Sequence, residues 1–242
     1  VDYDDLQGTF HCHTTWSDGR GTVAEMAEAA AARGWRYLGI ADHSVSAQYA
    51  GGLTVEEICG QHAEIDAWNA DRGGEVRLFK GVEADILRDG RLDYDDDVLA
   101  TFDYVIGSVH SGFRMDGESM TRRVVRAVEN PRLTILGHPT GRLLLRREPY
   151  ALDVDAVIDA AARTGAAIEI NGDPHRMDLG WRHWPAAKAR GVRTAVNPDA
   201  HSEAGLGAVV FGIAMARKGG LEPEDVINTW DVERVSDHFG GR

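Results

Sequence analysis

The chain has 242 residues, of which 43% are hydrophobic and 27% are charged, and its formal net charge is −13 at pH 7. This composition is typical of a soluble globular domain with a full hydrophobic core. The negative charge argues against a nucleic-acid-binding surface, unless the acidic residues gather around bound cations that offset part of their charge.

The sequence shows no pattern typical of a membrane span, a signal peptide or a disulfide-rich protein. No apolar run reaches the ~18–20 residues needed to cross a bilayer. Residues 1–5 are acidic, which is not the pattern of a signal peptide. The two cysteines, Cys12 and Cys59, form no disulfide framework, so we expect a cytoplasmic protein without a membrane partner.

Buried strands alternate with helices along the whole chain. Capping boxes at Thr22–Glu25 and Thr54–Glu57 start two helices, and Gly34 and Gly73–Gly74 follow their ends. The predicted strands cover residues 6–13, 36–41, 76–82, 104–109, 133–137, 166–170 and 193–197. The predicted helices cover residues 22–33, 54–72, 119–130, 154–164, 184–190 and, with a break at Gly219–Gly220, 203–239.

This alternation is typical of a parallel sheet. About seven strands follow one another with no linker rich in proline or serine between them. We therefore predict an α/β fold in which residues 1–242 form a single domain. The simplest architecture is one closed barrel with slightly fewer strands than the standard eight.

The segment around His11 and His13 is the first candidate site. Two residues that are two apart on a strand point to the same face, so these imidazoles could form half of a metal site. Cys12 points to the opposite face, and we interpret it as a core residue. Asp18 follows in a short polar loop that could bring a carboxylate back over the imidazoles.

Most of the other predicted strands also end in a histidine or an acidic residue. Each of these residues alone is more often a solvated side chain than a ligand. A barrel, however, brings the carboxyl ends of its strands to one face, so these side chains would meet there. The sequence therefore predicts a multinuclear metal centre built from His11, His13, Asp18, His43, Glu83, His110, His138, Asp199 and His201.

Imidazole and carboxylate ligands without thiolate suit manganese, zinc or iron better than magnesium or calcium. Paired divalent ions polarise phosphoryl oxygens and activate water, so phosphoester hydrolysis is the reaction class that this ligand set favours. Asp42, beside His43, is expected to support a ligand and not to be one.

The motifs HCHTTWSDG, ADHS, GVEADI, GSVHSG, GHP and PDAHS span nearly the whole chain. With them the sequence resembles the PHP family, the polymerase and histidinol phosphatase domain. The segments SGFRMDGESMTRR, ILGHPTGRLLLRREPY, IEINGDPHRMDLGWRH and EPEDVINTW resemble most closely the C-terminal PHP domain of bacterial family-X DNA polymerases. The resemblance implies a distorted (β/α)7 barrel that belongs to a longer chain, with a polymerase core in cis.

The resemblance also implies up to three divalent ions, of which manganese is the functional one expected and zinc or iron are alternatives. The first ion would take His11, His13, Glu83 and Asp199. The second would take Glu83, His110 and His138, so that Glu83 bridges two ions, and the third would take Asp18, His43 and His201. Within this centre the resemblance assigns catalytic roles to Glu83, His110, Asp199 and His201.

The activity that the resemblance implies is a 3′→5′ exonuclease, or an abasic-site endonuclease, acting on DNA in a nucleoid-associated location. The candidate substrate-binding residues are Arg142, Arg146, Arg147, His175 and Arg176. His175 could equally be a solvated loop residue, and a second arginine group at Arg122, Arg123 and Arg126 is better interpreted as a solvated helix face. Trp16 and Phe113 could stack on a base or pack in the core.

Two alternatives remain open at this point. The same centre would serve a small-molecule phosphatase of the histidinol-phosphate type, or a metal-stabilised polymerase module without catalysis. The sequence also departs from the family pattern at Thr9, where aspartate is usual, and at Pro198, where threonine is usual. Thr9 could weaken the support of His11 or His13.

Overall fold

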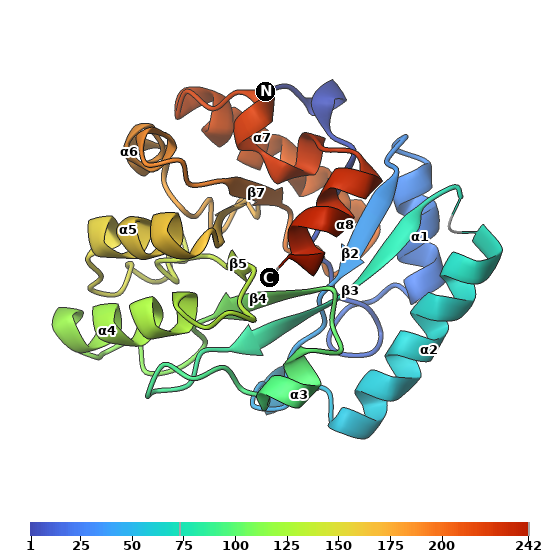
Figure 1. The fold of residues 1–242 in the computed structure, drawn as a ribbon, viewed down its shortest axis with the longest axis horizontal. Helices are drawn as coiled ribbons and strands as arrows, with labels where there is room; N and C mark the ends of the chain where they lie inside the picture. Colours follow the sequence, from blue (N-terminus) through green and yellow to red (C-terminus); the bar gives the residue numbers. More distant parts are fainter. Residues whose placement is uncertain (73, 242) are drawn as a thin grey trace.

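The computed structural model describes residues 1–72 and 74–241 and contains one seven-stranded parallel sheet (Figure 1). Its strands follow one another in sequence order, and the sheet curls into a nearly closed barrel, which confirms the predicted distorted (β/α)7 architecture. The strands are β1 (Gly8–Thr9), β2 (Tyr37–Ile40), β3 (Arg77–Asp85), β4 (Tyr104–Ser108), β5 (Ile135–Leu136), β6 (Ala167–Asn171) and β7 (Thr194–Asn197).

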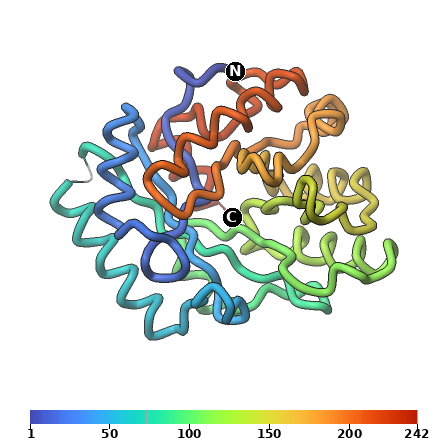
Figure 2. Tube along the Cα trace, turned by 180° about the vertical axis from the view of Figure 1, so that it is seen from behind, coloured from blue at the N-terminus to red at the C-terminus, as the bar shows by residue number. Residues whose placement is uncertain are grey.

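Helices surround this sheet on its outer side, as the trace from the back also shows (Figure 2). They are α1 (Val23–Ala31), α2 (Val55–Arg72), α3 (Asp96–Leu99), α4 (Gly117–Val128), α5 (Val154–Thr164), α6 (Trp184–Ala189), α7 (Val209–Lys218) and α8 (Val232–Gly240). Gly73, expected just after α2, lies outside the described residues. No helix in the described part of the chain has the length and apolar character needed to span a membrane.

The two predicted capping boxes begin their helices as expected. The Thr22 backbone N–H donates to the Glu25 carboxylate at 2.8 Å, and the Glu25 N–H donates back to the Thr22 hydroxyl at 3.2 Å. Thr54 and Glu57 make the same pair of bonds at the start of α2. These bonds satisfy backbone donors that a helix leaves free in its first turn.

The first predicted strand is shorter than expected. Ladder pairing stops at Thr9. Beyond it the Cys12 carbonyl still accepts from the Ala41 N–H, just after β2, at 2.8 Å, and the chain also lies against the loop after β7. There the His13 N–H donates to the Ala200 carbonyl at 2.8 Å, and the Ala200 N–H donates to the His11 carbonyl at 3.1 Å. His11 and His13 therefore lie past the end of β1, not within it.

The barrel closes between β1 and β7 through a side chain. The Asn197 side-chain oxygen accepts from the Phe10 N–H at 3.1 Å and from the Thr9 hydroxyl at 3.2 Å. The Thr9 hydroxyl contacts neither His11 nor His13 in the hydrogen bonds of the described residues, so its departure from the family pattern acts on the closure of the barrel.

The N-terminal end of the barrel is filled by aromatic rings and covered by α8. The Phe239 ring lies 5.2 Å from the Phe10 ring and 5.1 Å from the Tyr104 ring, centroid to centroid. The Tyr104 hydroxyl also donates to the backbone carbonyl of Phe10. With one end sealed by this packing, the opposite end, where the strands finish, is the face open to a ligand.

Two segments differ from the predicted elements. The short helix α3 was not predicted, because four residues are too few to show helical periodicity. The expected C-terminal helix of residues 203–239 does break at Gly219–Gly220, but it divides into α7, α8 and short 3-10 turns at Ala204–Ala208, Pro223–Asp225 and Ile227–Thr229. Pro223 cannot continue the backbone ladder of a helix, which accounts for the interruption.

Candidate metal centre

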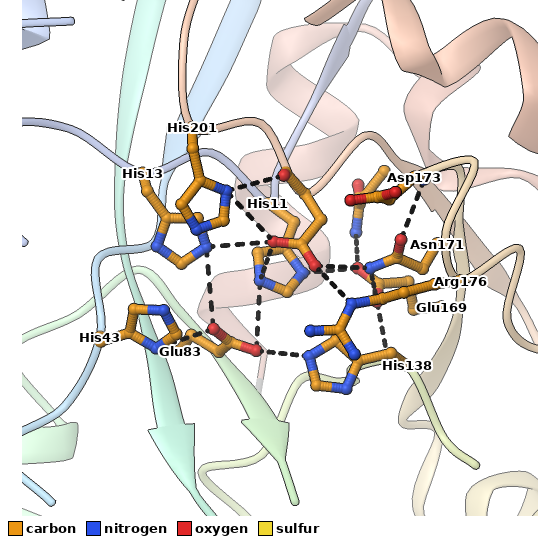
Figure 3. Close-up of polar contacts among 12 residues, drawn as sticks. His11, His13, His43, Glu83, His138, Glu169, Asn171, Asp173, Arg176 and His201 are labelled. Carbon is orange, nitrogen blue, oxygen red and sulfur yellow. Dashed lines mark hydrogen bonds and ion pairs between the residues drawn. The ribbon is translucent and has the colours of Figure 1, made fainter. Parts of the chain in front are cut away.

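A buried carboxylate lies at the middle of the open end of the barrel, with imidazoles on several sides (Figure 3). Glu83 projects from within β3, which ends at Asp85 and so extends beyond the predicted strand of residues 76–82. Its Oε1 atom lies 2.8 Å from His138 Nε2, 3.3 Å from His11 Nε2 and 3.3 Å from His110 Nε2. Its Oε2 atom lies 3.0 Å from His43 Nδ1.

Two further carboxylates complete the cluster. Asp199 Oδ1 lies 3.3 Å from His13 Nε2 and 3.6 Å from His11 Nε2. Asp18 Oδ1, near the solvent side, lies 3.3 Å from His201 Nε2. The barrel thus brings together every residue that the sequence predicts as a metal ligand.

Four overlapping groups of these side chains have potential ligand atoms within 4.8 Å of one another. The groups are His13, Asp18, His43 and His201; His11, His13 and Glu83; His11, His138 and Asp199; and His43, Glu83 and His110. Because members are shared, the geometry does not divide the residues into separate ion sites. The three predicted ligand sets, and the bridging role of Glu83, stay predictions.

The hydrogen bonding of the imidazoles also fits the binding of divalent metal ions. Among the described residues, several buried imidazole nitrogens make no hydrogen bond: His11 Nε2, His13 Nδ1 and Nε2, His43 Nδ1 and His138 Nδ1. Buried polar atoms without partners are rare in folded proteins, because each loses its hydration without replacement. Their concentration beside Glu83 and Asp199 is what a metal site requires.

The pKa values of two imidazoles in this centre are shifted in opposite directions. Burial and the neighbouring imidazoles of His43 and His201 lower the pKa of His13 to about 3, so this ring is neutral and able to bind a metal. Burial also disfavours the charged form of His110, but Glu83 and Asp85 outweigh it and raise its pKa to about 9. His110 must therefore lose a proton when a metal binds.

The carboxylates of the centre are ionised. Burial acts to raise the pKa of Glu83, but the surrounding imidazoles, His11 first, hold it well below its ordinary value. For Asp199 burial is likewise outweighed, by His11, His13 and Arg176, and its pKa is also well below the ordinary value. Before any metal binds, these carboxylates are therefore paired with positively charged neighbours, among them the protonated His110 and Arg176.

Glu169, in the middle of β6, was not predicted as part of the site. It is fully buried, and its Oε1 atom accepts from His11 Nδ1 at 2.7 Å, while its Oε2 atom accepts from the His138 N–H at 2.7 Å. The pKa of Glu169 is lowered because His11 outweighs the burial. A lone acidic residue inside the apolar run AAIEI was the available signal, since such residues are rarely fully buried without a partner.

Asp85 supports a second imidazole in the same way. Its Oδ1 atom lies 2.6 Å from His110 Nδ1, which leaves His110 Nε2 directed at Glu83. Among the described residues, Asp42 makes no hydrogen bond to an imidazole; it accepts from the Thr14 N–H and hydroxyl at 2.7 Å each and from the Ser17 hydroxyl at 2.5 Å. Asp42 therefore holds the loop that carries Asp18. It supports a predicted ligand, as expected, but it does so through this loop and not through His43.

Arg176 reaches into the centre from the loop after β6. Its Nε atom lies 3.1 Å from Asp199 Oδ2, and its guanidinium lies above His138 (Figure 3). Burial acts to lower its pKa, but Asp199, Glu83 and Glu169 raise it, so the cation is retained. His175, its neighbour, is exposed and directs its carbonyl to the Leu144 N–H at 2.6 Å.

The other predicted arginines differ in their surroundings. Arg142 donates through Nε to the Arg176 carbonyl at 2.9 Å and also donates to the Met177 carbonyl, so it ties two loops together. Arg147 donates to the Gly141 carbonyl at 2.8 Å and lies over the Phe113 ring at 4.0 Å. Arg146 is exposed. Of these three residues, Arg146 is the one that is exposed, whereas Arg142 and Arg147 are partly buried.

The remaining candidates mostly serve the fold. Arg123 is buried and donates to the backbone carbonyls of Leu87 and Ser111 at 2.8 Å each, so the interpretation of its group as a solvated face is wrong for this residue. Trp16 packs at Gly60 of α2 and donates to Glu64, which favours loop anchoring. The Phe113 ring contacts the Arg147 guanidinium and stacks on Tyr150, with ring centroids 6.2 Å apart.

Fold and site together define a class: a seven-stranded α/β barrel whose strand ends carry a buried cluster of imidazoles and carboxylates. A family model described as the PHP domain matches residues 9–172. The chain belongs to the PHP domain family.

Several known proteins are similar to the chain. It is 43% identical over 235 residues to the "DNA polymerase/3'-5' exonuclease PolX" of Bacillus subtilis, a match that covers 97% of this chain and 41% of that protein. A "Probable phosphatase" of Thermoanaerobacter is 28% identical, over 95% of this chain and 92% of its own length. The chain therefore spans less than half the length of the B. subtilis relative.

The fold is also found in a solved structure of a phosphatase. The histidinol phosphate phosphatase of Lactococcus lactis, solved with zinc, L-histidinol and phosphate, superposes with a TM-score of 0.65 at 17% identity. The match covers 90% of this chain and 95% of that protein. At this identity the likeness supports the barrel fold alone.

Proposed function

We propose that this chain is a metal-dependent phosphodiesterase that removes nucleotides from the 3′ end of DNA, as the PHP domain of a family-X DNA polymerase. The observation that carries the proposal is the convergence of buried imidazoles without hydrogen-bond partners on the Glu83 and Asp199 carboxylates. The finer assignment to DNA draws on the relative named as a polymerase and 3′–5′ exonuclease, which is more similar to this chain than the phosphatase-named relative.

The residues that would hold the ions are the imidazoles and carboxylates of the centre, with Glu83 between the first two sites. Bound divalent ions supply Lewis-acid activation of the phosphoester and of the attacking water. Glu169 keeps the Nδ1 proton on His11, so that Nε2 presents its lone pair to the centre. Asp85 does the same for His110.

Arg176 is the residue best placed to bind the phosphoryl group. It is the cationic side chain that pairs with Asp199, and most of its surface is buried, so its charge is screened little by solvent. Its fork of donors suits the non-bridging oxygens of a phosphodiester. Arg146, exposed beyond the same loops, would contact a phosphate further along the strand.

A direct assay separates this proposal from its alternatives. The purified chain, loaded with Mn²⁺, is given a 5′-labelled single-stranded oligonucleotide and, separately, a panel of phosphomonoesters that includes histidinol phosphate. Stepwise shortening of the labelled strand supports the proposal. Turnover of the monoesters alone would assign the chain to the small-molecule phosphatases, which the phosphatase-named relative favours. Metal uptake with no turnover of either substrate would indicate a structural module.

The polymerase core in cis is a proposal of the same kind. The match covers 41% of the B. subtilis relative, so a longer chain of that kind has room for a polymerase core. A comparison of strand shortening by residues 1–242 alone and by the longer natural chain would show how much that core contributes to DNA binding.

A further inference from the structure

One aromatic ring is exposed at the edge of the centre and has no role so far. Tyr49 lies in the 3-10 turn Gln48–Ala50, and 73% of it is exposed. Its ring centroid lies 6.2 Å from the imidazole of His43 and 6.4 Å from that of His110. By comparison, Phe211 is 43% exposed on α7. Tyr49 therefore presents a large apolar face beside the imidazoles of the metal centre.

The loop that carries Tyr49 is held firmly in place. The Leu53 N–H donates to the His43 carbonyl at 2.9 Å, which closes the base of the loop, and the Gly52 N–H donates to the Ala47 carbonyl at 3.1 Å within it. A Cβ atom on Gly52 would lie 1.8 Å from the Ser44 carbonyl oxygen, so the chain packs tightly there. The exposure of Tyr49 is thus a feature of an ordered loop.

Contacts to a neighbouring segment fix the outer side of the loop as well. The Val45 N–H donates to the Tyr94 hydroxyl at 3.1 Å, and the Ser46 N–H donates to the Asp93 carboxylate at 2.7 Å. The ring that this loop presents is held before any ligand arrives, which lowers the entropy cost of binding to it.

Cations are within electrostatic range of the ring. Partial desolvation on the side of the ring that faces the centre, together with the carboxylates of Asp85, Glu83 and Asp18, raises the pKa of the Tyr49 phenol, whereas the charge of Arg176 lowers it. The phenol in turn acts on the pKa of the Arg147 guanidinium. Tyr49 therefore borders the same space as the metal centre and the arginines proposed to bind phosphate.

We propose that Tyr49 is a stacking subsite for the nucleobase of the nucleotide whose phosphoester lies at the centre; this deepens the proposed function and rests on it. The metal ions that the centre would hold and the arginines can bind the phosphate, but neither offers an apolar plane to a base. An aromatic ring supplies that plane for any base, because every base has a π face. One sugar joins base and phosphate, so a base on Tyr49 leaves its phosphate beside His43 and His110.

The test compares Tyr49→Ala and Tyr49→Phe on two oligonucleotides, one with a normal 3′-terminal nucleotide and one with a 3′-terminal abasic residue. We expect Tyr49→Ala to lower kcat/KM for the normal end by about 5- to 150-fold, mainly through KM, and to leave the abasic end unchanged. Tyr49→Phe keeps the ring and should match the unaltered chain. Tyr3→Ala serves as the matched control. It also removes an exposed aromatic ring, but Tyr3 lies in the turn that precedes β1, at the end of the barrel opposite to the metal centre.

Equal losses on both oligonucleotides, or no loss on either, would overturn the stacking subsite. A loss in Tyr49→Phe as large as in Tyr49→Ala would assign the effect to the hydroxyl and would also overturn it. A second measurement does not depend on DNA cleavage: calorimetric binding of thymidine 5′-monophosphate and of 2-deoxyribose 5-phosphate. Preference for the base-bearing ligand that disappears in Tyr49→Ala supports the subsite even if the chain fails to cleave DNA; equal binding of both ligands contradicts it.

Discussion

The Glu169 carboxylate accepts a hydrogen bond from Nδ1 of His11 at 2.7 Å, and Nε2 of the same ring is directed toward Glu83 and Asp199. Glu169 also accepts from the His138 backbone N–H and from the Asn197 side chain at 2.9 Å. The strand β6 contributes no predicted ligand. Through Glu169, however, it orients the His11 ring and holds the backbone of His138, which are both predicted ligands.

Removing this carboxylate should cost stability and metal affinity together. Glu169→Ala leaves buried donors on His11, His138 and Asn197 without an acceptor, so we expect a loss of about 3–5 kcal/mol in the free energy of unfolding. Glu169→Gln keeps the shape and one acceptor, and it should mainly weaken metal binding, by roughly 10- to 100-fold. Urea unfolding of the metal-free chain and calorimetric metal titration measure the two effects.

Glu129→Ala is a suitable control for these variants, because Glu129 is an exposed acid paired with Arg163 on the helical side of the barrel. Its removal should change the unfolding free energy by no more than about 0.5 kcal/mol. Normal metal affinity in Glu169→Gln would show that Glu169 does not orient His11.

The position of Glu83 among the imidazoles predicts that its removal abolishes activity. Glu83→Ala removes a carboxylate that lies near His11, His43, His110 and His138, so bound metal should fall and hydrolysis should be lost. Metal content by elemental analysis and turnover of the labelled oligonucleotide measure this. Glu56→Ala, an exposed acid on α2, is the control. Near-normal rates in Glu83→Ala would contradict the bridging assignment.

Arg176 should affect substrate more than metal. We expect Arg176→Ala to lower kcat/KM by about 10- to 100-fold, because a charge-assisted contact to a phosphoryl oxygen is lost. Arg176→Lys keeps the charge but not the paired donors, so it should recover only part of the rate. Initial rates over a range of substrate concentration give both values. Equal activity of all three chains would remove Arg176 from the substrate-binding residues.

Asp178 predicts a pH dependence of stability. It is fully buried, and burial raises its pKa to about 6 even though it accepts two bonds from Thr140. The folded state therefore favours the protonated acid, which contributes to the free energy of unfolding. This contribution is fully present below pH 3.8, the ordinary pKa, and is lost as the pH rises through about 6. Relative to Asp178→Asn, the unaltered metal-free chain should therefore lose up to about 3 kcal/mol between acid and neutral pH. Urea unfolding of both chains at each pH measures the difference, and a constant difference would contradict it.

Arg146 predicts an effect on DNA affinity that depends on salt. Its side chain is exposed, so its contact with a phosphate would release counterions and little else. Arg146→Ala should weaken binding of single-stranded DNA and reduce the salt slope by about 0.7. Fluorescence anisotropy over a range of salt concentration measures the slope. Arg36→Ala, exposed just before β2 at the opposite end of the barrel, should leave the slope unchanged.

Much of the fold follows from local patterns in the sequence. Capping boxes and apolar runs place the main strands and helices, because these signals act over a few neighbouring residues. His110 and His138 could be predicted as part of the site because each follows an apolar strand. The length of β1 could not, because its pairing depends on Ala200, far along the chain.

The supporting residues were harder to predict for the same reason. Glu169 lies inside a strand, and its partner His11 is a neighbour only once the barrel has closed. Arg142 and Arg123 look like free cations in the sequence, but both donate to backbone carbonyls of other segments. Such long-range bonds leave no periodic signal in the amino-acid order.

The seam between β1 and β7 has a consequence for how the molecule is made. His11 and His13 are synthesised well before Asp199 and His201, and bonds across the seam, among them those of Ala200 with the first segment, bring the two pairs together. During translation, the earlier imidazoles therefore lack these partners until β7 and the loop after it have emerged. The full set of ligand atoms exists only from that point, so we expect ions to be bound once the last strand of the barrel has been made.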